Sequence, residues 1–229
     1  MNHRVLFIVT AADRMGEEPT GFWFEELSAP YYVFTDAGKA VTLATIPGGE
    51  APVDRRSLPD DDAERPDNVR RFLADDSAME QLRNTQRLAD VRFEDYDAIF
   101  FPGGHGAVVD LPTDSDLAIR LGEAFDRGQV IGAVCHGPGG LLGARRSDGQ
   151  PIVAGRKVNG FTNEEEDAVG LSATVPFLLE SRLRELGGVF ESGAMFQPYA
   201  VRDGNLVTGQ NPQSSQLTAE RVLEVLAEQ

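Results

Sequence analysis

Short runs of consecutive apolar residues alternate along this chain with longer stretches in which apolar positions recur at helical spacing. The apolar runs predict strands at residues 4–10, 41–46, 96–102, 130–135 and 157–162. The first, third and fourth runs are almost continuously apolar, which is typical of strands buried on both faces of a sheet. The pattern therefore indicates a parallel sheet with helices on both sides.

Helical spacing occurs mainly between these runs, and Asp203-Gly204 is a turn signal between two short extended segments. The predicted helices span residues 25–37, 79–85, 114–127, 175–186 and 212–227, and the predicted hairpin spans residues 199–208. Alternating strands and helices joined by right-handed crossovers form an open twisted sheet. We therefore predict a single α/β domain over residues 1–229, doubly wound around a mostly parallel, flavodoxin-like sheet.

One segment does not fit this alternation. Residues 47–68 contain four prolines and the acidic run Asp60-Asp61-Asp62, and they show no hydrophobic period. Because the strand pattern resumes afterwards, we predict a surface excursion of the same domain and not a linker.

Composition and charge exclude several classes of protein. The chain has 229 residues, 41% of them hydrophobic, which is enough for one domain with a sizeable core. A net charge of −16 repels phosphate backbones and argues against nucleic-acid binding. The apolar run near the N-terminus is too short to span a bilayer, so no membrane association is predicted. A single cysteine forms no internal disulfide, and we expect a cytoplasmic protein.

That cysteine, Cys135, lies where a buried strand meets a glycine turn, in the segment Ala-Val-Cys-His-Gly-Pro. A side chain at such a turn stands above the carboxyl ends of the strands, where open α/β sheets place their sites. We expect an apolar helix to follow and to favour the thiolate through its dipole. A lone cysteine is more often a small buried hydrophobe, but the adjacent His136 and the glycines favour a nucleophile elbow.

A second glycine-rich loop, Phe-Pro-Gly-Gly-His-Gly at residues 101–106, follows a neighbouring buried strand. Its backbone N–H groups could stabilise an oxyanion. The loop lacks the lysine of a P-loop and does not complete the dinucleotide-binding pattern. Two of the three histidines of the chain, His105 and His136, lie in these two loops, which favours a shared site.

Two acidic segments supply candidate carboxyl groups. Glu25 and Glu26 open the helix after the first strand, where they either reach the strand ends or only complement the helix dipole. Residues 164–167 are all acidic, and one of them could orient the histidine beside the cysteine as the third member of a triad. For Glu164 and Glu165 we expect a solvated turn. The sequence contains no Gly-x-Ser-x-Gly, Cys-x-x-Cys or His-Glu-x-x-His motif, and we predict neither a metal nor a cofactor.

The two loops, together with the Thr-Gly-x-x-x-x-Glu-x-x-x-Pro spacing at residues 20–30, resemble the ThiJ/PfpI superfamily of the class I glutamine amidotransferase-like fold. The resemblance is closest to its heat-shock glyoxalase III and holding-chaperone branch, and it covers nearly the whole chain. It implies a homodimer. It also selects Glu26 over Glu25 as the functional carboxyl group.

The resemblance implies a role for each matching residue. Cys135 is the nucleophile, Glu26 is its carboxyl partner, His136 is the acid/base group, and Glu166 is the acid that orients His136. The acidic run leaves the identity of that last residue open by one or two positions. Because a thiolate neighbour and burial both disfavour a charged carboxyl, we expect a raised pKa for Glu26.

The resemblance places the backbone of Gly104 and of His136 in an oxyanion hole, with His105 in the substrate-binding group. The aromatic residues at 22–24 are candidates for the pocket wall, although a core role is expected for at least one. Glutamine amidotransferases of this fold use a histidine far downstream of the cysteine, and this chain has none after His136. Glutamine hydrolysis is therefore not expected.

The implied activity is the conversion of methylglyoxal or a related 2-oxoaldehyde to a 2-hydroxy acid (lactate from methylglyoxal), through a hemithioacetal on Cys135 and without glutathione or a metal. Three alternatives remain open. The same cysteine could act in a hydrolase that removes glycation adducts from proteins or nucleotides, or that cleaves peptides. The protein could be a holding chaperone with an exposed apolar patch. It could also be a redox sensor in which Cys135 forms a sulfinic acid stabilised by Glu26.

Overall fold

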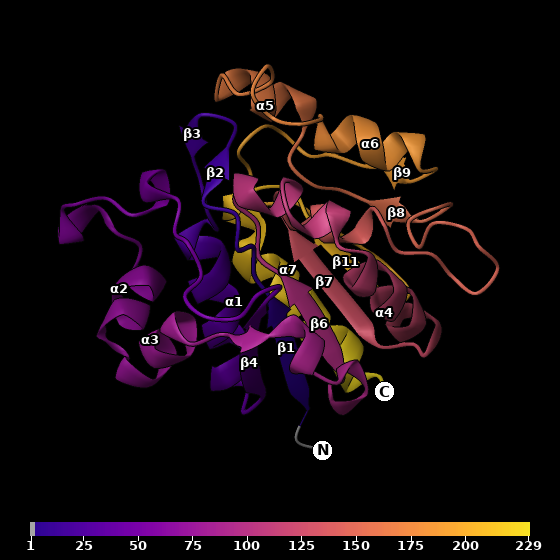
Figure 1. Cartoon of the computed structure of the whole chain (residues 1–229), viewed down its shortest axis with the longest axis horizontal. Helices are drawn as coiled ribbons and strands as arrows, with labels where there is room; N and C mark the ends of the chain where they lie inside the picture. Colours follow the sequence, from indigo (N-terminus) through magenta and orange to yellow (C-terminus); the bar gives the residue numbers. More distant parts are fainter. Residues whose placement is uncertain (1–2) are drawn as a thin grey trace.

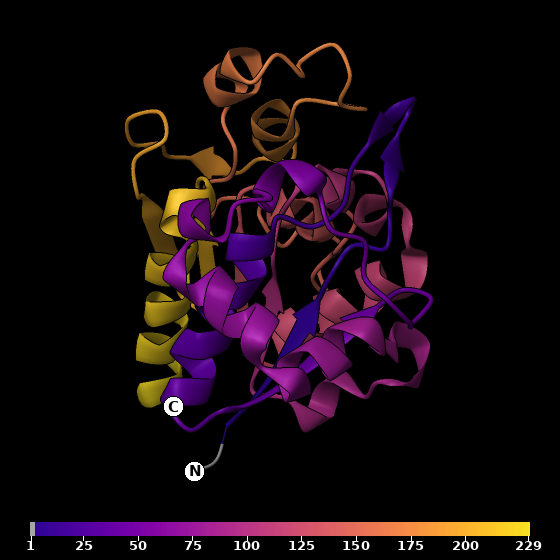
Figure 2. The ribbon, with the colours of Figure 1, turned by 90° about the vertical axis from the view of Figure 1, so that its left-hand side faces the viewer.

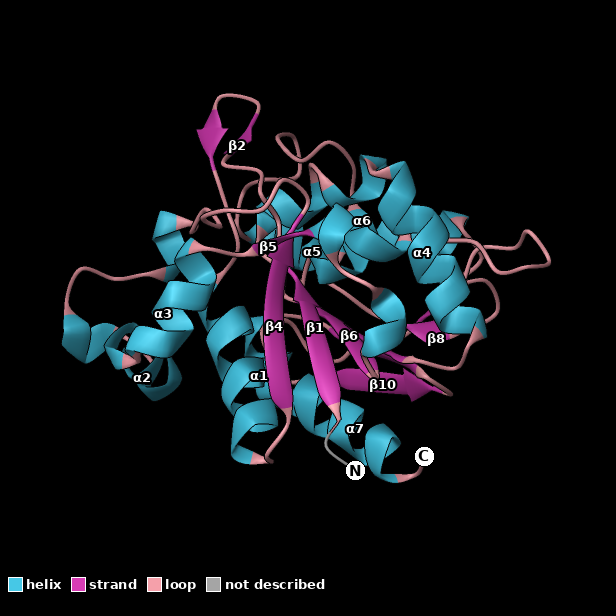
Figure 3. Ribbon diagram, turned by 60° about the horizontal axis from the view of Figure 1, so that its bottom comes forward, coloured by secondary structure: helices cyan, strands magenta, loops and turns pink. Residues whose placement is uncertain are grey.

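The computed structural model describes residues 3–229 and contains a central sheet of seven strands. In spatial order the strands are β10 (Ala200–Asp203), β11 (Leu206–Gly209), β7 (Val130–Val134), β6 (Ala98–Phe101), β1 (Arg4–Ile8), β4 (Ala40–Thr45) and β5 (Gln86–Arg87) (Figure 3). All neighbouring pairs are parallel except β10 and β11, which form the predicted hairpin. The mostly parallel α/β fold is therefore confirmed.

Helices cover both faces of this sheet (Figures 1 and 2). They are α1 (Phe24–Asp36), α2 (Asp67–Ala74), α3 (Asp76–Arg83), α4 (Ser115–Asp126), α5 (Asn163–Ala168), α6 (Leu179–Glu185) and α7 (Ser215–Ala227). On one face α1 and α7 pack together, and Leu27 and Val222 belong to one core cluster. On the other face α4 contributes Leu117 and Leu121 to a second cluster. No helix within residues 3–229 has the length and apolarity needed to cross a bilayer.

The two central strands explain the nearly continuous apolar runs. Every residue of β6 and β7 is buried, because each strand has a parallel neighbour on both sides and a core cluster on both faces. Gly132 in β7 permits especially close packing, since a Cβ atom there would lie 2.6 Å from the Phe100 ring and 2.8 Å from Val222. The sequence pattern therefore located the centre of the sheet correctly.

The fifth predicted strand, residues 157–162, is wrong as a strand of the central sheet. Only Lys157–Val158 forms a strand, β8, and it pairs with β9 (Val189–Phe190) in a separate two-stranded sheet. The position beside β7 is taken by β11. Beyond β8 the chain leaves the sheet, and the Phe161 N–H donates to the carbonyl oxygen of Cys135 at 2.9 Å. The chain is thereby led over the carboxyl ends of the strands.

Residues 159–199, which we call the cap, lie over this end of the sheet (Figure 1, orange at the top). The cap includes α5, α6 and β9. A small hairpin formed by β2 (Arg14–Met15) and β3 (Glu18–Pro19) projects from the same end (Figure 2). Residues 47–66 contain only short 3-10 turns before α2, a helix that the hydrophobic pattern did not predict.

Candidate active site

The loops after β1, β6 and β7 meet at one point on the sheet edge. The chain crosses from the β1–β4 half of the sheet to the β6–β7 half there, and such a reversal of strand order opens a crevice at the carboxyl ends of the strands. A pocket of about 140 Å³ occupies this place. It is lined by Trp23, Glu26, Gly104, His105, Cys135, His136, Phe161, Val169, Phe196, Pro212 and Gln213. The pocket therefore brings together residues from both glycine loops, the first helix and the cap.

Cys135 follows β7 directly and has a left-handed backbone conformation with φ of 57°, which is uncommon for a residue other than glycine. Its N–H donates to the carbonyl oxygen of Gly209 at 2.9 Å, which attaches the turn to the end of β11. Gly137 allows the turn to approach the neighbouring loop, since a Cβ atom there would lie 2.2 Å from the carbonyl oxygen of Phe101. This is the sharp turn that the glycines predicted.

The expected thiolate is wrong for the resting protein. The segment after Cys135 is a five-residue 3-10 helix, Gly137–Leu141, and not a longer apolar α-helix. Burial raises the pKa of the Cys135 thiol well above its usual value, and the neighbouring Glu26 carboxyl raises it further. The thiol form of Cys135 is therefore favoured near neutral pH.

Glu26 is fully buried in the first turn of α1, whereas Glu25 is partly exposed. The Gly103 N–H donates to Oε2 of Glu26 at 2.9 Å, and Oε1 has no hydrogen-bond partner within residues 3–229. Burial is the main cause of a pKa far above the usual value for a glutamate, although the Cys135 thiol and the Gly103 N–H lower it in part. The expectation of a raised Glu26 pKa is confirmed, and the raised pKa favours the neutral carboxyl group.

The pKa of Glu166 is shifted in the opposite direction from that of Glu26. His105 Nε2 lies 2.8 Å from its Oε1 atom, and His136 Nε2 lies 2.7 Å from its Oε2 atom. Burial alone would raise the pKa of Glu166, but the hydrogen bonds from the two imidazoles lower it to about 2. Glu166 is therefore ionised at neutral pH and can only accept, so both Nε2 atoms carry a proton.

This arrangement determines the tautomer of His136. Burial lowers the pKa of His136 to about 4, and the nearby His105 lowers it as well, so the ring is neutral at pH 7. With its proton on Nε2, the ring has a free lone pair on Nδ1. That atom lies 3.4 Å from the sulfur of Cys135. His136 is consequently placed to accept the thiol proton, with Glu166 behind it.

His105 lies against His136, with ring centroids 4.0 Å apart. Its Nε2 atom is directed to Glu166, and its Nδ1 atom is buried without a partner within residues 3–229. The nitrogen and oxygen ligand atoms of His105, His136 and Glu166 lie within 4.8 Å of one another. A metal ion could be held there only if both hydrogen bonds to Glu166 were given up, so the expected absence of a metal stays a prediction.

Two backbone N–H groups remain available beside the sulfur. Gly104 has a φ of 96°, a conformation that favours glycine, and a Cβ atom there would lie 2.4 Å from the carbonyl oxygen of Gly21. Within residues 3–229, neither the Gly104 N–H nor the His136 N–H donates to a protein acceptor. The two loops thus present unpaired donors of the kind that an oxyanion requires.

Sequence reasoning missed several residues of the site. Glu164 and Glu165 were both expected in a solvated turn, but Glu165 is fully buried, whereas Glu164 is exposed. A signal was present, because Thr162 and Glu165 have capping-box spacing and form that box at the start of α5. Of the aromatic residues at 22–24, only Trp23 lines the pocket, whereas the other two are in the core. Phe196 lines the pocket as well and had no recognisable sequence signal.

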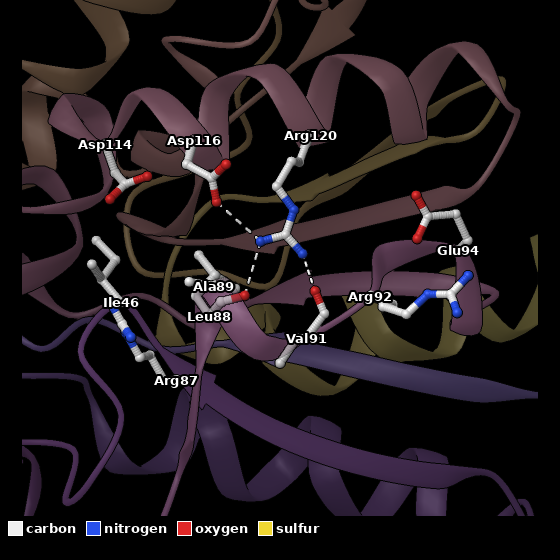
Figure 4. Close-up of a pocket in the computed structure, with 10 residues that line it drawn as sticks. All are labelled: Ile46, Arg87, Leu88, Ala89, Val91, Arg92, Glu94, Asp114, Asp116 and Arg120. Atoms are coloured by element: carbon white, nitrogen blue, oxygen red, sulfur yellow. Dashed lines mark hydrogen bonds and ion pairs between the residues drawn. The ribbon is translucent and has the colours of Figure 1, made fainter.

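A second, wider pocket of about 630 Å³ lies between α4 and the segment before β6 (Figure 4). Arg120 crosses it, pairs with Asp116 and donates to the carbonyl oxygens of Leu88 and Val91. Its guanidinium also stacks on Phe93 at 4.1 Å. These contacts attach α4 to the neighbouring segment, and the pocket contains no nucleophile or histidine.

Comparison with known proteins agrees with this arrangement. Glyoxalase 3 of Candida albicans is 32% identical over 216 residues, which is 89% of each chain. The glutathione-independent glyoxalase hsp3102 of Schizosaccharomyces pombe is 32% identical over 220 residues, covering 90% of this chain and 89% of the relative. The crystal structure of glyoxalase III from Candida albicans superimposes with a TM-score of 0.87 at 28% identity and covers 97% of both chains.

The family profile described as DJ-1/PfpI matches residues 19–225, which include every residue of the pocket. The sequence resemblance that rested on the two glycine loops and the Glu26 spacing is therefore confirmed over most of the chain. The chain belongs to the DJ-1/PfpI family.

Proposed function

We propose that this protein converts methylglyoxal or a related 2-oxoaldehyde to the corresponding 2-hydroxy acid without glutathione. One observation carries the proposal: the Cys135 sulfur lies 3.4 Å from Nδ1 of His136, in a pocket that is also lined by the buried Glu26, whose pKa is raised. The names of the relatives, which are a glyoxalase 3 and a glutathione-independent glyoxalase, support the same activity. The enclosed pocket favours a small substrate over a peptide or a glycated protein.

In the first step the sulfur of Cys135 adds to the aldehyde carbon of the substrate. A carbon–sulfur bond forms, the thiol proton moves to Nδ1 of His136, and the aldehyde oxygen becomes an oxyanion. The unpaired N–H groups of Gly104 and His136 stabilise that oxygen until it takes up the proton of the Glu26 carboxyl group and a hemithioacetal results. Glu26 is then ionised and can accept the proton that the substrate releases in the next step. The ionised Glu166 stabilises the positive charge that His136 acquires in this step.

In the second step a proton leaves the former aldehyde carbon and another is added to the neighbouring carbon. The two electrons of the broken carbon–hydrogen bond pass through an enediol, so the aldehyde carbon is oxidised to a thioester and the ketone is reduced to an alcohol. A carboxyl group with a raised pKa is suited to accept and return such protons near neutral pH. We assign this role to Glu26.

Water then attacks the thioester, and the carbon–sulfur bond breaks. Cys135 recovers its proton and the 2-hydroxy acid leaves, which is lactate when the substrate is methylglyoxal. The overall reaction adds one water molecule and transfers electrons only within the substrate, so the scheme requires no glutathione, metal or external oxidant. The lone cysteine suits a reducing compartment, and we place the reaction in the cytoplasm and in a homodimer.

The test is lactate formation from methylglyoxal by the purified protein in the absence of glutathione. We expect turnover by the wild-type protein and a loss of at least about 10⁴-fold in Cys135→Ser, because the alcohol is a far weaker nucleophile than the thiol. An equally active Cys135→Ser variant would contradict the proposal. Absence of turnover in both would move the holding-chaperone, hydrolase and redox-sensor alternatives ahead of it.

A further inference from the structure

A fully buried carboxyl group, Glu165, has no part in the chemistry proposed above. Its Oε1 atom accepts hydrogen bonds from the Phe196 N–H at 2.8 Å, from Gln210 Nε2 at 3.0 Å and from Asn211 Nδ2 at 2.8 Å. Its Oε2 atom accepts from the N–H and the hydroxyl of Thr162. These donors come from the start of α5, from the end of the cap and from the segment after β11. Glu165 thus joins three segments of the chain at one point.

The amide side chains of this cluster also hold the end of the cap. Gln210 Oε1 accepts from the Gly193 N–H at 2.9 Å, and Asn211 Nδ2 donates to the carbonyl oxygen of Gln197 at 3.0 Å. Both amide side chains are fully buried, so these bonds do not compete with water. The segment between residues 193 and 197 is therefore fixed on both sides of Phe196.

Phe196 itself has a left-handed backbone with φ of 55°. A bulky side chain adopts this conformation only where the surrounding structure imposes it, and the Glu165 cluster is what imposes it here. The result is that the Phe196 ring lies in the pocket wall, with its centroid 6.3 Å from that of Phe161. Phe161 in turn stacks on His136 at 4.8 Å. A continuous aromatic wall therefore extends from the reacting residues to the edge of the pocket.

We propose that Phe196, held in place by Glu165, sets the size limit of the substrate and restricts the site to 2-oxoaldehydes with a small apolar substituent. This inference rests on the proposed function. The pocket of about 140 Å³ lies well below the range of about 300–1,000 Å³ that is typical of sites for drug-sized ligands. The polar groups near Cys135 serve the two carbonyls, so the substituent is left to the apolar wall of Phe161, Val169 and Phe196.

The first experiment measures access to Cys135 and does not depend on turnover. The protein is treated with iodoacetamide or with its bulkier N-phenyl derivative, and mass spectrometry follows labelling of the single cysteine. We expect the ratio of the N-phenyl rate to the iodoacetamide rate to rise at least tenfold in Phe196→Ala. Phe177→Ala is the matched control, because Phe177 lies in the cap but does not line the pocket. Its ratio is expected to equal that of the wild type.

The second experiment compares the consumption of methylglyoxal and phenylglyoxal. If the inference is correct, Phe196→Ala increases kcat/KM for phenylglyoxal relative to methylglyoxal at least tenfold, mainly through KM. Glu165→Gln is expected to raise the labelling ratio and the kcat/KM ratio as well, each by a smaller factor. The amide has one oxygen and one N–H₂ group, so it cannot accept from the three donors now at Oε1 and also from Thr162.

The outcomes separate the two proposals. An unchanged labelling ratio in Phe196→Ala, or an equal rise in Phe177→Ala, would overturn the size limit even if methylglyoxal turnover is normal. A raised labelling ratio in a protein without turnover would keep the size limit for the pocket while the glyoxalase proposal fails. If Glu165→Gln does not fold, Phe196→Ala decides the question alone.

Discussion

The strand-end region around Glu26 and the cap region around Glu166 each bury one carboxyl group of the same site. The pKa of Glu26 is raised, whereas the pKa of Glu166 is lowered. Glu26 receives one backbone N–H and leaves Oε1 without a partner. Glu166 receives an imidazole N–H on each oxygen. The difference shows that burial alone does not decide whether a carboxyl group is charged, because the number of donors facing it can outweigh desolvation.

The same difference assigns the roles. A neutral carboxyl group can donate and take back a proton, so Glu26 suits the proton transfers on the substrate. A permanently charged carboxylate cannot do so near neutral pH, but it fixes the tautomer of His136 and stabilises its charged form. Each of the following tests removes one half of this contrast.

The largest effect is expected for Glu26→Gln. The amide keeps the size of the side chain and can accept the Gly103 N–H, but it cannot exchange protons with the substrate. We expect the rate of lactate formation to fall by about 10³-fold, within the range of about 10²–10⁴-fold for loss of a general acid–base group. Glu25→Gln, one position earlier in α1, is the control and is expected to change the rate less than threefold. A similar loss in both variants would contradict the role of Glu26.

For Glu166→Gln we expect the rate of lactate formation to fall by about 10²-fold. An amide accepts from one Nε2–H group but presents an N–H₂ group to the other imidazole, so the histidine tautomers must change. Nitrogen NMR of the His105 and His136 rings tests this directly, because a merely structural role would not move a proton from Nε2 to Nδ1 in either ring. Glu164→Gln, on the exposed side of α5, serves as the control. An unchanged tautomer of both His105 and His136 in Glu166→Gln would refute the orienting role.

For His105→Gln we expect a smaller fall in the rate of lactate formation, of about tenfold. This change retains a donor that can reach Glu166 but removes the imidazole that lies 4.0 Å from the ring of His136. Because His105 contributes to the lowered pKa of His136, that pKa should rise from about 4 towards the ordinary histidine value. A proton NMR titration of His136 measures the change. A pKa that does not move would show that the two rings are electrostatically independent, and one that falls would contradict the expected repulsion between them.

The smallest effect concerns stability, and its sign differs between the two carboxyl groups. The folded-state pKa of Glu26 is raised, so this group costs stability increasingly as the pH rises above about 4.5, towards its folded value. Glu26→Gln should therefore be more stable than the wild type at pH 8, with the gain vanishing near pH 4. Urea denaturation at the two pH values measures this difference.

The pKa of Glu166 is lowered to about 2, so its contribution is present above about pH 4.5 and is lost as the pH falls through its folded value. Glu166→Gln should accordingly be less stable than the wild type at pH 8, and the difference should shrink in acid. If both variants shifted stability in the same direction at pH 8, the contrast between the two regions would be wrong.

Local sequence determined the centre of the fold and most of the site. The continuous apolar runs identified β1, β6 and β7, since strands covered on both faces leave no polar alternation. Glycines marked the turns, because only small residues permit the close approach of the Cys135 and Gly104 loops. Cys135 and His136 were named from the glycine turn, whereas Glu26 and Glu166 were selected by the family resemblance, and the structure brings all four together.

Only the tertiary structure determined the pKa values of these groups and the residues that pack around them. The raised pKa of Cys135 reverses the expectation from a helix dipole, because desolvation and a carboxyl neighbour depend on what packs over the turn. The burial of Glu165, the departure of residues 159–162 from the sheet and the position of Phe196 depend on contacts between segments far apart in the chain. Sequence patterns report local periodicity and turn chemistry, whereas charge states and pocket size are set by long-range packing that no local pattern encodes.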